Sequence, residues 1–207
     1  SDINQLRFEL DAIASGVGGH LAIGTIMGAV PLLSDALSNV LARQPHMSVE
    51  IIEDTSETLL GMIERGQIHA AICRSSVSRT PEVYESLFIK QESLSVIASV
   101  RHPAMGAKAV QLQDLQDSRW LVYRARMPMR RLLEREFHEA GLHFPSHLIE
   151  TTSALATVTM LGRNNDLVAL VSDDIANYFS RNGLVGIIDL TLQSRSEPYE
   201  LVLRKGA

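Results

Sequence analysis

Residues 20–73 read HLAIGTIMGAVPLLSDALSNVLARQPHMSVEIIEDTSETLLGMIERGQIHAAIC and contain three apolar stretches, 20–26, 49–53 and 68–73, each of strand length. Apolar residues at helical spacing lie between them: Val30, Leu33, Leu37, Val40 and Leu41 in the first interval, Leu59, Leu60 and Ile63 in the second. We expect Ser56 to cap the second helix and Gly66 to end it. The order strand–helix–strand–helix–strand, with short connections, predicts an α/β fold with a parallel sheet flanked by helices.

The same layout begins again in the second half of the chain. Further strands are predicted at 84–90, 94–98, 120–123, 147–150, 167–171, 185–190 and 199–204. Helices are predicted between the later strands, where Ser153 and Ser172 stand at capping positions. No sequence repeat of fixed period accompanies this repeated βαβαβ order.

The first residues have a different pattern. Ile3, Leu6, Leu10 and Ile13 follow each other at heptad spacing, which predicts the tail of a longer linker helix. Ser15-Gly16-Val17-Gly18-Gly19 then breaks the helix. Residues 1–18 are therefore expected to be a helix end and a hinge.

Composition excludes several classes of protein. Asp and Glu number 24 against 19 Lys and Arg, and the net charge is −5, so the chain lacks the basic surface of a nucleic-acid binder. Its longest apolar runs, such as Leu167–Val171, are far short of the roughly 20 residues that span a membrane. The single cysteine, Cys73, suits a reducing compartment. With no secretory signal at its start, the chain is expected to be cytoplasmic.

Several stretches resemble one family of bacterial regulators. These are Leu21–Thr25, Leu41–Pro45, Val49–Ile51, Thr55–Glu57, Ile63–Ile68, Leu94–Pro103, Met129–Leu133 and Glu150–Ser153. In this order and spacing they resemble the C-terminal effector-binding domain of LysR-type transcriptional regulators, in the subgroup for sugars and aromatic compounds. The chain departs from the pattern at His69, where the family commonly has Asp. It also departs where the family commonly has Gly-x-Gly and a later Pro, since this chain has Gly162-Arg163-Asn164-Asn165-Asp166 and Val171-Ser172 there. Asn tolerates the left-handed backbone that Gly supplies, so the turn is expected to survive.

The resemblance implies the type 2 periplasmic binding protein fold, in which two Rossmann-like lobes are joined by two crossover strands. Lobe I would comprise residues 19–96 and 187–207, and lobe II residues 97–186. A cleft between the lobes would bind the effector. The DNA-binding helices of the family would lie in an N-terminal domain that is absent from this chain.

Candidate ligand-binding residues follow from both the resemblance and the pattern, because ligands of open α/β sheets bind where strands end and helices begin. They are Thr25, Ile26, Met27, Gly28, Thr55, Ser56, Arg74, Ser75, Arg124, Arg126, Met127, Thr152 and Ser153. Simpler roles compete with ligand binding at several of them. Ser56 and Ser153 can be helix caps, Arg74 can form a structural salt bridge, and Met27 and Met127 can be core residues.

The remaining motifs indicate no catalytic, metal or cofactor site. Cys73 ends a buried strand and is expected to be a small buried hydrophobe. His143 and His147 have no third ligand nearby in sequence, so no metal site is predicted. Gly16-Val17-Gly18-Gly19 precedes a strand, the wrong order for a dinucleotide fingerprint. We expect no cofactor, and no catalytic Ser, His and Asp set stands out.

Three functions remain in competition. The first is an effector-sensing regulatory domain that binds a small polar or anionic molecule, forms a homodimer or higher homo-oligomer, meets DNA only through the absent N-terminal domain, and associates with no membrane. The second is an extracytoplasmic solute-binding protein of a transporter, which would need no heptad seam at residues 3–13. The third is a small enzyme on the same fold, for which no acid–base pair is visible.

Overall fold

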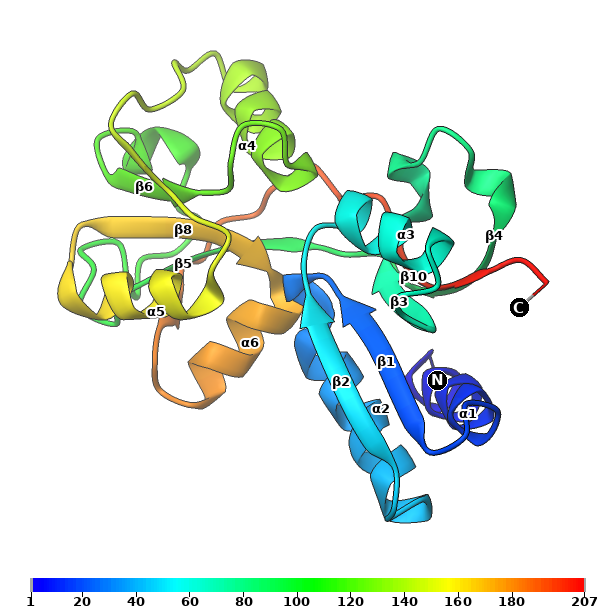
Figure 1. Ribbon diagram of the computed structural model, residues 1–207. Coiled ribbons are helices and arrows are strands. Elements are labelled where there is room, and N and C mark those ends of the chain that lie inside the picture. Colours follow the sequence, from blue (N-terminus) through cyan, green and yellow to red (C-terminus); the bar gives the residue numbers. More distant parts are fainter. Residues whose placement is uncertain (1, 207) are drawn as a thin grey trace. The chain divides into compact units, whose positions relative to one another are not determined.

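A computed structural model describes residues 2–206 and divides the chain into two compact units, which Figure 1 lets the reader follow by colour. Unit 1 comprises the chain up to Gln91 together with the segment from Glu197, and unit 2 comprises Glu92–Ser196. Each unit contains one five-stranded sheet. The α/β class and the repeated layout predicted from the sequence are therefore confirmed.

Unit 1 has the strand order β2-β1-β3-β10-β4. Its strands are β1 (His20–Thr25), β2 (Ser48–Glu53), β3 (Ala70–Cys73), β4 (Tyr84–Lys90) and β10 (Tyr199–Arg204), and its helices are α1 (Asp2–Ser15), α2 (Val30–Arg43) and α3 (Ser56–Glu64). β1, β2 and β3 are parallel, so their carboxyl ends share one edge, whereas β10 runs antiparallel to β3 and begins at that edge.

Helix α3 packs so closely on the sheet that Gly24 of β1 has no room for a side chain. A Cβ on Gly24 would lie 2.5 Å from Leu59 Cδ2 and 3.2 Å from the Cβ of Ala71. His69 aligns the neighbouring strands, because its Nδ1 accepts the Ala22 N–H at 2.9 Å while its own N–H donates to the Ala22 carbonyl. Histidine thus has a defined structural role at this departure from the family pattern.

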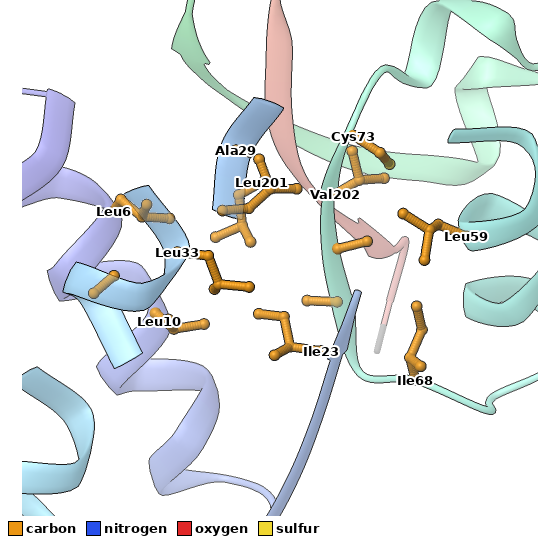
Figure 2. Packing of buried hydrophobic residues seen from close by; sticks show 14 of the residues in the cluster. Leu6, Leu10, Ile23, Ala29, Leu33, Leu59, Ile68, Cys73, Leu201 and Val202 are labelled. Carbon is orange, nitrogen blue, oxygen red and sulfur yellow. The ribbon is translucent and has the colours of Figure 1, made fainter. Parts of the chain in front are cut away.

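The N-terminal helix is part of the core of unit 1. Leu6 and Leu10, assigned from the sequence to a heptad seam, are wholly buried and point toward Leu33 of α2 (Figure 2). Arg7 also forms a two-bond ion pair with Asp35 of α2, at 2.8 and 2.9 Å. The seam residues are therefore used within unit 1.

Unit 2 has the strand order β7-β6-β8-β5-β9. Its strands are β5 (Leu94–Ala98), β6 (Arg119–Val122), β7 (Leu148–Glu150), β8 (Leu167–Ser172) and β9 (Gly186–Ile187), and its helices are α4 (Pro128–Glu139), α5 (Ala154–Arg163) and α6 (Asp173–Arg181). Trp120 and Phe137 meet edge to face in its core, with ring centroids 5.4 Å apart.

Two local predictions for unit 2 are wrong. β9 is shorter than the predicted strand 185–190, because a turn in which Leu190 N–H donates to the Ile188 carbonyl bends the chain. Asn164 does not adopt a left-handed backbone: its φ is −134°, and its side chain closes α5 by donating to the Met160 carbonyl at 2.9 Å.

Candidate functional site

The candidate residues of unit 1 gather at the edge where β1, β2 and β3 end. Thr25 ends β1 and is wholly buried, with its hydroxyl donating to the Ile26 carbonyl at 2.8 Å. Ile26 donates its N–H to the Ile72 carbonyl of β3, and Met27 and Gly28 follow in a half-exposed 3₁₀ turn. The Thr25 hydroxyl therefore fixes the turn and leaves Met27 and Gly28 nearer to solvent.

Thr55 caps α3, so the expectation that Ser56 is the cap is wrong. The Thr55 hydroxyl accepts the Thr58 N–H at 3.3 Å, and Ser56 is the first helical residue. Ser56 Oγ instead accepts the backbone N–H of Arg74 at 3.0 Å, which ties the start of α3 to the end of β3. Since Ser56 is only 9% exposed, this bond satisfies a backbone donor in a buried place.

The start of α3 keeps hydrogen-bond donors. Within residues 2–206, the backbone N–H groups of Ser56 and Glu57 donate to no protein group, as expected of the first turn of a helix. In its bond with Arg74 the Ser56 hydroxyl uses an oxygen lone pair, so its proton can still be donated to a further group. This corner of unit 1 therefore presents donors to an anionic or hydroxylated group.

Arg74 and Ser75 link the end of β3 to Glu197 and Glu200, at the start of the last strand, β10. Arg74 is 6% exposed, and its Nε donates to the Glu197 carbonyl at 3.1 Å. Ser75 donates its N–H and its hydroxyl to Glu200 Oε1, at 3.1 and 2.7 Å. Glu200 was missed from the sequence; the signal that could have found it is the position of the last strand, whose antiparallel pairing with β3 sets Glu200 opposite Cys73.

Cys73 is inert in this setting. Burial, with a smaller contribution from the negative charge of Glu200, raises the pKa of its thiol to about 12, against the opposing influence of Arg74. The interpretation of Cys73 as a buried hydrophobe is confirmed.

The candidate residues of unit 2 lie on two neighbouring loops at the carboxyl ends of β6 and β7. Arg124 and Arg126 are exposed on the loop that leads from β6 into α4, and Met127 takes the N-cap position without a side-chain bond. Thr152 is exposed, and Ser153 caps α5 by accepting the Ala156 N–H at 3.1 Å, as predicted. The structure thus brings each half of the candidate set together within its own unit.

The other end of the parallel strands in unit 2 has a hollow of about 370 Å³. It is lined by Gln116, Asp117, Ser118, Arg119, His143, Phe144, Pro145, Ser146, His147 and Asp166. Across residues 2–206 no group of three or more His, Cys, Asp or Glu side chains is arranged to hold a metal ion. In the same described part of the chain, none of the helices combines the length and apolar character needed to cross a membrane.

Comparisons with known proteins agree with this architecture. The model of the LysR substrate binding domain family matches residues 14–207. The HTH-type transcriptional regulator GbpR of Azospirillum brasilense is 24% identical over 201 residues, which are 96% of this chain and 58% of that protein. The chain thus spans little more than half the length of this curated relative.

Solved structures share the fold. The effector binding domain of QuiR in complex with shikimate superposes with a TM-score of 0.69 at 15% identity, covering 91% of this chain and 88% of that one. The BenM effector binding domain with its effector benzoate gives 0.69 at 18% identity, covering 92% and 86%. The predicted type 2 periplasmic binding protein fold is confirmed by these neighbours. With the family model covering nearly all of it, the chain belongs to the LysR substrate binding domain family.

Proposed function

We propose that this chain is the effector-sensing part of a cytoplasmic transcriptional regulator that controls transcription through a separate DNA-binding domain. Its relative GbpR is named an HTH-type transcriptional regulator, and the QuiR and BenM domains bind small carboxylates. The effector binds one conformation of the protein better than another, and this difference in affinity shifts the population between them.

The observation that supports this function best is the donor arrangement at the start of α3. The N–H groups of Ser56 and Glu57 and the Ser56 hydroxyl can donate to one oxygen-bearing group, and the positive end of the helix dipole favours a negative one. The exposed Arg124 and Arg126 provide positive charge on unit 2. The proposed effector is therefore a small carboxylate, with or without hydroxyl groups.

Two alternatives are less favoured. A solute-binding protein would share the fold, but the relatives are transcriptional regulators. An enzyme needs a positioned nucleophile or acid–base pair. The lone cysteine is a buried thiol of raised pKa, and the site groups described above are hydrogen-bond donors, so we propose that the domain binds its effector without altering it.

We also propose that the chain forms a homodimer through α2 and the edge strand β2. Leu41 on α2 is 42% exposed and Ile51 on β2 is 53% exposed, so each presents apolar surface that a second copy of the chain could cover. Light scattering at tens of micromolar protein should give the mass of a dimer, and Leu41→Glu should lower it. A monomeric mass for the wild type would contradict this assembly.

A panel of small carboxylates with and without hydroxyl groups tests the ligand class. Shikimate, benzoate and their uncharged amide and alcohol counterparts should be screened by thermal unfolding, with titration calorimetry on any compound that raises the melting temperature. A ligand at a concentration 100-fold above its Kd stabilises the folded state by about 2.7 kcal/mol. Stabilisation by carboxylates and not by their uncharged counterparts supports the proposal; the reverse preference contradicts it.

A further inference from the structure

The chain returns from unit 2 to unit 1 through residues 188–198, which form neither helix nor strand. Ser194 and Ser196 are nevertheless only 7% and 2% exposed. Buried backbone groups need hydrogen-bond partners, and a segment outside the sheet must find them elsewhere. For Ser194 the partner is a side chain of helix α4, and for Ser196 it is the main chain of Glu92.

Helix α4 holds this segment through two adjacent residues. The Glu136 carboxylate accepts the Ser194 N–H, and Arg135 Nη2 donates to the Ser194 hydroxyl at 3.2 Å. Glu92 holds Ser196 differently: the Ser196 N–H donates to the Glu92 carbonyl at 3.4 Å, and the Ser196 hydroxyl donates to Glu92 Oε1 at 3.1 Å. Glu136 is 7% exposed, and a buried polar group is costly unless it is hydrogen-bonded, so the bond from Ser194 N–H satisfies one oxygen of this buried side chain.

The first turn of the same helix holds the loop that carries Arg124, Arg126 and Met127. Arg130 Nη1 donates to the Tyr123 carbonyl at 3.0 Å, where that loop begins. The Arg130 side chain is 9% exposed, lies 2.8 Å from Glu134 Oε1 and stacks 5.0 Å from the Phe144 ring centroid. The loop is therefore fastened to α4 by a buried and well-packed cation.

The part of α4 between these two attachments is well packed. Leu133 and Phe137 are almost wholly buried, and Glu136 lies six positions after Arg130, a distance of about 9 Å along the helix axis. Because close-packed helices shift as units rather than bending continuously, a movement at one end reaches the other.

We propose that Glu136 is a positioning residue that couples the candidate ligand loop, residues 124–127, through α4 to the segment that leads back to unit 1. Ligand contact at the loop changes how firmly α4 holds Ser194. The loop's role as a ligand contact rests on the proposed function, whereas the coupling through α4 can be tested without any ligand.

The test compares Glu136→Met, which keeps the volume and removes the acceptor, with Glu136→Gln, which keeps an acceptor. Glu139→Met is the matched control, because Glu139 lies on the same helix with a side chain 59% exposed. Its ion pair with Arg135 is exposed and 4.0 Å long, so losing it should have little effect on how Arg135 contacts Ser194. Hydrogen exchange at residues 192–196 should quicken about tenfold in Glu136→Met and stay near the wild-type rate in the other two variants. The amides of strands β6 and β8 should keep their protection from hydrogen exchange. A general loss of stability of unit 2 would instead quicken exchange there too.

The second readout is the nitrogen–proton NMR spectrum of the ligand-free chain. Coupling is reciprocal, so Glu136→Met should shift the amide signals of residues 124–127 while Glu139→Met leaves them in place. Unchanged exchange at 192–196, equal quickening across unit 2, a Glu136→Gln variant that behaves like Glu136→Met, or unmoved loop signals would each overturn the proposal. Failure of the carboxylate panel would instead count against the proposed function.

Discussion

Ser56→Ala tests the central contact of unit 1 most sharply. The substitution removes the oxygen that accepts the Arg74 N–H at 3.0 Å and leaves that buried donor without its partner. An unsatisfied buried donor costs about 1–3 kcal/mol. For a unit of about a hundred residues, this corresponds to a melting temperature lower by roughly 5–15 °C.

Thr55→Ala is the matched control because it removes the neighbouring hydroxyl, which caps α3. Loss of the cap costs about 1 kcal/mol and should lower the melting temperature by roughly 5 °C. Once the panel has identified a carboxylate ligand, Ser56→Ala should also raise its Kd about ten- to a hundredfold, since a hydrogen bond to a charged group contributes about 1.5–3 kcal/mol. Thr55 was a candidate from the sequence, but its hydroxyl is engaged within α3, where it accepts the Thr58 N–H and donates to the Thr58 hydroxyl at 3.1 Å. We therefore expect Thr55→Ala to leave the Kd nearly unchanged.

Calorimetry measures both quantities. A Ser56→Ala melting temperature equal to that of the wild type would refute the acceptor role of Ser56 Oγ. A lowered melting temperature beside an unchanged Kd would leave Ser56 a structural link between α3 and β3 and remove it from the ligand site.

Three further outcomes follow from the packing and titration of single residues. Cys73 should react with a disulfide reagent at pH 8 about a thousandfold more slowly in the folded chain than in urea, because the buried thiol has a pKa of about 12; equal rates would contradict its burial. Burial lowers the pKa of His102 from 6.5, an effect larger than the opposing attraction of Asp166, so the neutral form is favoured on folding. The stability that His102 contributes is therefore present above pH 6.5 and is lost as the pH falls through the lowered pKa. In urea unfolding, the stability of His102→Gln should depend less on pH in this range than that of the wild type. An identical pH dependence in the two proteins would refute the assignment. Gly24→Ala should destabilise unit 1 by about 1–3 kcal/mol, because its Cβ would meet Leu59 at 2.5 Å, and an unaltered unfolding curve would show that α3 has room to move.

Periodicity predicted the order of helices and strands because burial of one face leaves a clear mark on the sequence. It could not decide between Thr55 and Ser56 as the cap, since both hydroxyls stand at the helix start and only the backbone determines which accepts the Thr58 N–H. The heptad pattern likewise showed that Leu6 and Leu10 are buried on one side, but not that α2 of the same unit covers them.

The residues that sequence reasoning missed act through distant partners. Glu200 accepts two bonds from Ser75, which is 125 positions away, and Glu136 accepts one from Ser194, 58 positions away. Neither carboxylate stands in a local motif, because its role depends on strand pairing and helix packing rather than on neighbours in sequence. The pairing of β10 with β3 had to be known before Glu200 could be placed at the site.

The most direct test of the proposed site is an NMR titration of the chain with the carboxylate from the panel that most raises its melting temperature. We predict that amide signals of residues 25–28, 55–58 and 74–75 in unit 1, and of 124–127 and 152–153 in unit 2, move with ligand concentration. Signals of residues 116–119 and 143–147, which line the hollow at the opposite end of the unit 2 strands, should stay in place. Movement confined to the hollow, or no movement with any carboxylate of the panel, would contradict the account.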